Sequence, residues 1–224
     1  MAARLTMLPT SEWRSVRFMY IAAPDRTLGE HEWRAFVEAQ AFGHFIAPGV
    51  DLAYLAVAPT QFVLEGSEIL AHFARPNPVL DALQANPRAM LSVAGDWAYI
   101  PSDWKTLGAE DPALGIPTTY YAAVQLKGHA EVRNDRAGIA DVLRRQLGVF
   151  QPSTAIADPL AAHATKLNAI RAVVLSVEEV AAKFKYGGNV DRNHREAVIS
   201  RLRTRRAPGD LSAAGHTERR LAVP

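Results

Sequence analysis

Apolar and polar positions alternate with a period of two over much of this chain and change to helical spacing in a few segments. Residues 42–47, 52–58, 61–64 and 68–73 are rich in β-forming residues and are separated by turn residues. This pattern predicts four strands in the first third of the chain. Before them, Trp33, Phe36 and Val37 recur at helical spacing, which predicts an amphipathic helix over residues 30–40.

The same pattern continues through the rest of the chain. Further strands are predicted at 89–94, 97–100, 118–133, 172–177 and 180–186, with a hairpin turn at Gly95-Asp96 and a bend at Gly128. Helices are predicted at 135–150 and 159–168, and around Ala197 to Leu202. Many short strands with few inserted helices favour a small closed β-barrel over a parallel α/β sheet.

The ends of the chain and one internal segment lack this periodicity. We expect an extension over residues 1–17, one domain over 18–203 and a flexible tail over 204–224. Residues 101–117 contain Pro, Gly, Asp and Ser with little period, and a loop of that length in a compact domain is usually functional or mobile. We expect this loop to lie beside a site.

Composition narrows the chemistry. The chain has no cysteine, which excludes disulfides, thiolate nucleophiles, zinc–thiolate sites and iron–sulfur clusters. No apolar run is long enough for a signal peptide or a membrane span, so we expect a cytoplasmic protein without membrane contact. The seven histidines lack the paired spacing of metal ligands, so no metal site is predicted, and no side chain is singled out as catalytic.

Residues 69–78 join a predicted strand to a predicted helix and are suited to hold an anion. Asn77 is a good helix N-cap and Pro78 suits the first helical position. Arg75 could grip phosphate oxygens beside the free N–H groups of the helix start. His72 and Ala74 share one side of the strand. The alternatives are that Asn77 only caps the helix, that Arg75 pairs with a carboxylate and that His72 is a structural histidine.

A second group of cations lies near the end of the last predicted strand. Lys183 and Lys185 flank Phe184, so the period of two places both ammonium groups on one face and Phe184 on the other. Two adjacent like charges are suited to an anion, although a solvated outer face is the ordinary alternative. Trp97, Tyr99, Trp104, Tyr120 and Tyr121 could wall a planar ligand, or could belong to the core or to a subunit contact.

These segments together resemble the PaiB-like family of FMN-binding split-barrel proteins. The resemblance rests on Ala71-His72-Phe73-Ala74-Arg75-Pro76-Asn77-Pro78 and on further matches in the family's order, over roughly residues 19–202. The further matches are Met19-Tyr20-Ile21, Ala98-Tyr99-Ile100, Trp104, Ile116-Pro117-Thr118 with Tyr121, and Lys183-Phe184-Lys185 with Asn189.

The resemblance implies a mainly β fold with flanking helices: a six-stranded split β-barrel of Greek-key type that pairs as a homodimer and holds FMN between its subunits. Residues of one site can then come from different chains. The implied cofactor-binding residues are His72, Ala74, Arg75, Asn77, Thr118, Tyr121, Lys183, Lys185 and Asn189. The chain departs from the family pattern at Trp97, Thr119, Tyr120 and Gly188, which bears on whether FMN is retained.

Two functions follow from the resemblance. The family is described as negative transcriptional regulators, for which the six arginines within residues 192–206 offer a possible DNA contact, although a solvated helix face is the commoner role of such a run. The alternative is an FMN-dependent oxidoreductase or flavin reductase acting on a small molecule, for which analogy of fold is the warrant. Haem binding through a histidine such as His72 ranks last.

Overall fold

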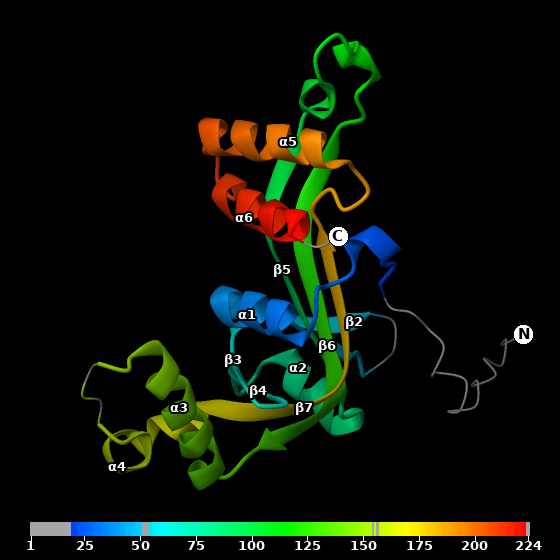
Figure 1. Ribbon diagram of the computed structural model, residues 1–224. Helices are drawn as coiled ribbons and strands as arrows, with labels where there is room; N and C mark the ends of the chain where they lie inside the picture. Colours follow the sequence, from blue (N-terminus) through cyan, green and yellow to red (C-terminus); the bar gives the residue numbers. More distant parts are fainter. Residues whose placement is uncertain (1–18, 51–53, 154, 156, 223–224) are drawn as a thin grey trace, which may run out of the picture.

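The computed structural model describes residues 19–50, 54–153, 155 and 157–222, and within them the chain forms one antiparallel sheet of seven strands with helices packed on it (Figure 1). The strand order is β2-β1-β5-β6-β7-β4-β3. The strands are β1 (Phe42–Pro48), β2 (Leu55–Gln61), β3 (Val63–Glu65), β4 (Glu68–Ala74), β5 (Arg88–Ile100), β6 (Thr118–Arg133) and β7 (Ile170–Lys185).

Six α-helices accompany the strands in the described ranges. They are α1 (Glu30–Gln40), α2 (Pro78–Ala85), α3 (Arg136–Phe150), α4 (Pro159–His163), α5 (Arg192–Arg205) and α6 (Asp210–Leu221). Figure 1 shows α1, α5 and α6 on the same side of the long strands β5, β6 and β7. No helix in the described ranges is long and apolar enough to cross a membrane.

The main core lies between the inner face of the sheet and helices α1, α2 and α6. Phe184 of β7 is fully buried and meets Phe36 of α1 edge to face, with ring centroids 5.7 Å apart. A second cluster forms where α3 packs its Ile139 and Val142 against Leu70 of β4 and Val174 of β7. The helices α1, α2 and α6 therefore cover the inner face of the sheet, and α3 covers the opposite face where β4 pairs with the first part of β7.

The long strands correct two sequence predictions. The hairpin predicted at Gly95-Asp96 is wrong, because β5 runs through this dipeptide as a bulge and pairs with β6 on both sides of it. Asp96 takes the positive φ of 51° within the bulge, which explains why the dipeptide reads as a turn. The strands predicted at 172–177 and 180–186 are one strand, β7.

Three further predictions change. The expected six strands are seven in the described sheet, which includes the three-residue strand β3 paired with β4. The prediction of a closed barrel is wrong for this sheet, because its strand order is open, with β2 at one edge and β3 at the other. The frayed tail predicted after residue 204 is wrong for residues 210–221, which form α6 and bury Ala213, Ala214 and His216. The prediction over residues 1–17 lies outside the described residues.

Candidate functional site

The junction between β4 and α2 has the geometry that the sequence predicts. Asn77 caps α2, and its side chain accepts a hydrogen bond from the Val79 N–H at 3.0 Å, with Pro78 at the first helical position. The backbone N–H of Arg75 donates to the carbonyl of Ala169 at 2.8 Å, which anchors the junction to the chain before β7. The Arg75 side chain is exposed and makes no hydrogen bond or ion pair within the described residues. Its charge is therefore available to a ligand.

His72 shares one face of β4 with Ala74, as predicted, and both residues are exposed. The His72 ring makes a 2.8 Å contact from Nδ1 to Oε1 of Gln146 on α3. Gln146 is buried and uses its own Nε2 to donate to the carbonyl of Leu70, so its Oε1 acts as the acceptor. His72 therefore carries a proton on Nδ1 and has a structural partner, while its Nε2 remains open.

The other predicted cations lie at the far end of β7. Lys183 and Lys185 share the outer face of this strand, and Phe184 points into the core, as the alternation predicts. Lys185 donates from Nζ to the Thr118 hydroxyl at 2.7 Å. The Lys183 Nζ instead lies 3.7 Å from the Asp25 carboxylate, with both side chains about nine-tenths buried. Lys183 is therefore neutralised by Asp25, whereas the one bond of the Lys185 ammonium among the described residues is to a neutral hydroxyl.

Tyr121 and Asn189 complete the group at this end. The Tyr121 ring lies on the same face as Lys183, whose Nζ is 5.6 Å from the ring centroid. Asn189 is exposed in the turn that follows β7. The preceding Gly188 lies against the carbonyl of Pro24, which leaves no room for a Cβ. The departure from the family pattern at Gly188 is therefore a consequence of this close approach by the N-terminal segment.

The predicted site residues form two separate groups in one chain. His72, Ala74, Arg75 and Asn77 lie where β4 pairs with the start of β7, since Ala74 faces Ile170. Thr118, Tyr121, Lys183, Lys185 and Asn189 lie at the opposite end, where Tyr121 faces Lys185. Fifteen residues of strand at about 3.3 Å each give a contour of about 50 Å between the two ends. The two groups therefore lie at opposite ends of β7, and we expect one FMN to contact only one of them in the same chain.

A flat strip of small residues lies on the outer face of the central strands, next to the second group. The register aligns Ser92, Gln125 and Ala181 in one row and Ala94, Ala123 and Lys183 in the next. The helices α1, α2 and α6 pack on the opposite, core face of these strands. The side-chain Oε1 of Gln125 is shielded from solvent but has no hydrogen-bond partner in the described structure. An acceptor without a donor, set among small side chains, fits the edge of a planar polar ligand.

The aromatic residues named from the sequence have different roles. Tyr120 is 1% exposed and belongs to the core, so the departure from the family pattern at this position changes the inner face of the sheet. Trp97 and Tyr99 are exposed on β5, and Tyr99 pairs with Thr119 of β6. Trp104 is partly buried, with the Arg205 guanidinium over its ring at 4.5 Å. Trp97 and Tyr99 remain available to a ligand or a second subunit.

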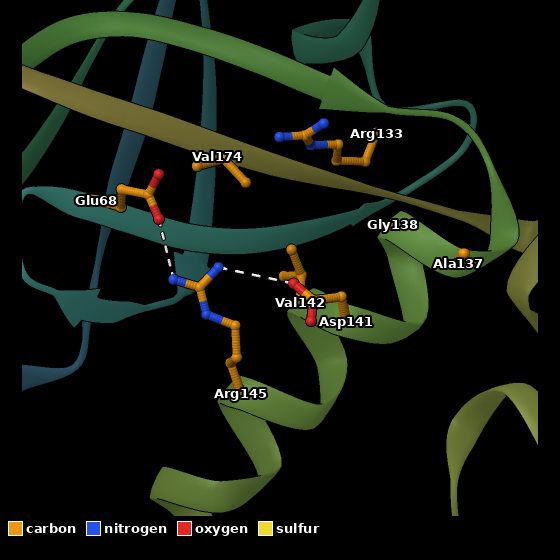
Figure 2. Close-up of a pocket in the computed structure, with 8 residues that line it drawn as sticks. All are labelled: Glu68, Arg133, Ala137, Gly138, Asp141, Val142, Arg145 and Val174. Atoms are coloured by element: carbon orange, nitrogen blue, oxygen red, sulfur yellow. Dashed lines mark hydrogen bonds and ion pairs between the residues drawn. The ribbon is translucent and has the colours of Figure 1, made fainter.

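A cavity of about 330 Å³ lies between α3 and strands β4 and β7 (Figure 2). Figure 2 shows Arg145 reaching from α3 toward Glu68 and Asp141, at 3.0 Å and 3.7 Å. Arg145 also bonds Glu65, at 2.7 Å. Three carboxylates therefore compensate its charge. This cavity is next to the first group but offers no free cation from Arg145, so we do not assign the phosphate to it.

A second cavity, of about 470 Å³, lies under the 101–117 segment, which sequence analysis expected beside a site. Its lining includes Lys105 and His194 together with the apolar side chains of Leu114 and Ile116. Lys105 was missed by sequence reasoning, because a single lysine in an aperiodic loop carries no recognisable pattern. Only the fold brings it to the end of the sheet that holds Thr118 and Lys185.

A family model matches most of this chain. Residues 19–179 match a family model described as "Putative FMN-binding domain". The chain belongs to this FMN-binding family. The match spans both groups of predicted site residues except Lys183, Lys185 and Asn189, and it identifies FMN as the cofactor. Among curated protein sequences, none matches the chain.

Solved structures agree on the fold. The chain is similar to a flavocytochrome from Azotobacter vinelandii, with a TM-score of 0.55, 21% identity and coverage of 72% of this chain and 69% of that one. It is also similar to an FAD- and haem-binding protein from Mycobacterium smegmatis, with a TM-score of 0.56, 17% identity and coverage of 78% of each chain. At this identity the likeness shows the fold alone: mainly β, with flanking helices, of the flavin-binding split-barrel type.

Proposed function

We propose that this FMN-binding protein is an FMN-dependent oxidoreductase that acts on a small molecule and works as a homodimer with shared cofactor sites. The observation that carries the proposal is the outer strip of small residues, where Gln125 offers an unpaired acceptor and Lys185 a cation without a carboxylate partner in the described structure. A flavin ring requires a flat wall with few polar contacts, set at the edge of the ring.

The residues present fit the cofactor when two copies of the chain contribute. Tyr121, Gln125 and Lys185 of one chain would border the ring. Arg75 and the Asn77-capped start of α2 of the partner subunit would hold the phosphate. This division explains why the two groups stand at opposite ends of β7. It also gives a role to the exposed apolar residues Leu55 and Val57 of the edge strand β2, since exposed apolar surface marks interaction sites.

The chemistry is divided between cofactor and protein. Bound FMN supplies the redox centre. The protein's residues bind and orient the cofactor. Arg75 offers a forked set of N–H donors that suits phosphate oxygens, and the Gln125 Oε1 can accept a hydrogen bond from an N–H group of the ligand at the strip. Lys185 adds positive charge at the end of the strip, which favours electron-rich ligands. A second copy covering the strip would exclude water from it.

Direct DNA contact, as a regulator of transcription would need, has less support from the surface of α5. The arginines of residues 192–206 are engaged in intramolecular contacts. Arg195 donates to the carbonyl of Arg220, and Arg201 to that of Asp103. Arg203 pairs with Glu218, and Arg205 bonds the fully buried Asp210 through two nitrogens. These contacts hold α5 against its neighbours, and they engage part of the donors that a phosphate backbone would need.

The first experiment tests cofactor binding. We expect the purified chain, mixed with FMN and passed through gel filtration, to keep a bound-flavin absorption spectrum. Arg75→Ala should weaken FMN binding about ten- to a hundredfold, since a hydrogen bond to a charged group contributes about 1.5–3 kcal/mol. Arg88→Ala is the matched control, because Arg88 is an exposed arginine with one weak 4.0 Å contact to Glu178.

The outcomes separate the hypotheses. Oxidation of a reduced nicotinamide by the FMN-loaded protein supports the oxidoreductase. A loaded protein without turnover, but with DNA affinity that falls steeply with salt, supports the regulator instead. If the chain retains no FMN, the proposed function is wrong, because it requires bound FMN.

A further inference from the structure

The lysines at the C-terminal end of β7 differ in how their charge is compensated. Lys183 is held by Asp25 at 3.7 Å and also donates to the Tyr20 carbonyl at 3.1 Å. In the described part of the chain, Lys185 makes one hydrogen bond, to the Thr118 hydroxyl at 2.7 Å. Lys105 has no hydrogen bond or ion pair with any described residue. Two of three neighbouring cations therefore lack a carboxylate within the described structure.

The fold brings Lys105 and Lys185 to the same place. Lys105 ends the 3-10 turn Ser102–Lys105, which follows β5 directly. The last residue of β5, Ile100, pairs with Thr118, the first residue of β6 and the partner of Lys185. Burial, together with the charge of Lys185, lowers the pKa of Lys105. Like charges held side by side are unfavourable unless an anion joins them.

The carboxylates around the neighbouring cavity are already occupied. Glu110 accepts from the Leu107 N–H at 2.8 Å and contacts His194 at 3.2 Å. Asp111 caps the short turn Pro112–Leu114 through the Ala113 N–H. Neither carboxylate bonds Lys105, so the ammonium of Lys105 has no anionic partner among the described lining residues, while Glu110 and Asp111 keep their negative charges nearby.

The cavity also has an apolar wall. Leu114 and Ile116 line it, and their side chains are 78% and 75% exposed. Exposed aliphatic side chains beside a half-buried cation match a ligand with a negative group and a small apolar body. The site is open to solvent on one side, and its volume of about 470 Å³ suits a small molecule.

We propose that Lys105, with Lys185 and Thr118, forms the anion-binding part of the substrate site, and that the substrate is a small organic anion whose apolar part packs on Leu114 and Ile116. This assignment rests on the proposed function for its link to the flavin. The anion site itself does not depend on FMN, because every residue in it is positioned by the fold alone.

The test uses the full chain and two probes, benzoate and inorganic phosphate. Backbone amide NMR shifts of Thr106, Gly115 and Ile116 are followed as each probe is added without FMN. We expect saturable shifts with benzoate, an apparent Kd raised about tenfold or more in Lys105→Gln, and recovery in Lys105→Arg, which keeps the charge. Lys166→Gln, an exposed lysine in a turn before β7, is the matched control and should bind like the wild type.

Each remaining outcome decides the inference. Absence of saturable shifts in the wild type, or an unchanged Kd in Lys105→Gln, overturns the anion site. Tighter binding of phosphate than of benzoate would contradict the claim that Leu114 and Ile116 bind the apolar part of the ligand. In the FMN-loaded protein, benzoate should perturb the flavin absorbance, and saturable binding without that perturbation overturns the role as a substrate site. Failure to retain FMN would count against the proposed function, and the flavin-free titration would still decide the anion site.

Discussion

At the scale of single residues, two neighbouring buried tyrosines differ in whether the hydroxyl group has a hydrogen-bond partner. Tyr120 and Tyr186 meet edge to face, with centroids 6.0 Å apart. Tyr186 donates to the Asp96 carbonyl at 2.9 Å, whereas the Tyr120 hydroxyl has no partner in the described structure. Burial raises the pKa of Tyr120 to about 12, although the charge of Arg195 acts to lower it.

Because of this difference, we expect replacement of tyrosine by phenylalanine to change the free energy of unfolding differently at the two positions. Tyr186→Phe should lower the free energy of unfolding by about 1 kcal/mol or more, because it removes a buried hydrogen bond and leaves the Asp96 carbonyl without this donor. Tyr120→Phe should leave that free energy unchanged or raise it, because it removes an unpaired polar group. Denaturant titration of both variants measures the effect. Equal destabilisation by the two would show that the Tyr120 hydroxyl has a partner, such as an internal water.

At the scale of elements, α6 is held to α1 by a buried ion pair. Arg220 of α6 bonds Glu32 of α1 through both terminal nitrogens, at 2.8 Å and 3.2 Å, and the side chains are only 4% and 8% exposed. His216 of the same helix contacts Asp96 in the β5 bulge at 2.8 Å and stacks on Tyr186. This polar anchoring explains why a segment with the composition of a tail forms a docked helix.

Breaking the buried pair should loosen α6. Glu32→Gln leaves the Arg220 charge buried and unpaired, so we expect a loss of about 3–5 kcal/mol in the free energy of unfolding. Glu218→Gln is the control, because its partner Arg203 is more than half exposed, and it should cost less than about 1 kcal/mol. Thermal or denaturant unfolding measures both, and a Glu32→Gln variant as stable as the control would contradict the assignment.

The Glu32–Arg220 pair also makes the stability of the folded protein depend on pH in the acid range. Burial acts to raise the pKa of Glu32, but hydrogen bonds from Arg220 and the Leu28 N–H, with the Arg220 charge, lower it overall below the ordinary 4.5. A carboxyl group with a lowered folded-state pKa contributes stability that is present above pH 4.5 and is lost as the pH falls through its folded-state pKa. Glu32→Gln should reduce this acid sensitivity.

At the scale of the whole molecule, the part of the outer face of the sheet that α3 does not cover predicts self-association. β2 is an edge strand, and its Leu55 and Val57 are exposed. Val57→Asp should convert a dimer to a monomer in sedimentation and reduce FMN retention with it, because each proposed site needs two chains. Leu211→Asp, at an exposed position of α6, is the control and should stay dimeric. A monomeric wild type that keeps FMN would contradict the shared site.

The sequence alone determined what local chemistry decides. The cap at Asn77, the shared face of Lys183 and Lys185, and the burial of Phe184 follow from helix-end hydrogen bonding and from strand alternation, so they could be read without a fold. The family pattern indicated the cofactor. Gly95-Asp96 misled because the dihedral angles of a turn also serve a bulge within a long strand.

Tertiary structure alone decided which distant residues meet. Asp25 neutralises Lys183, Lys105 comes to Lys185, and Arg75 lies a strand's length from both. No local pattern encodes these distances, because they depend on how the ends of β4, β5 and β7 are arranged in one sheet. The same arrangement docked α6 through Arg220 and Glu32, an ion pair between residues 188 positions apart whose burial only the packed molecule reveals.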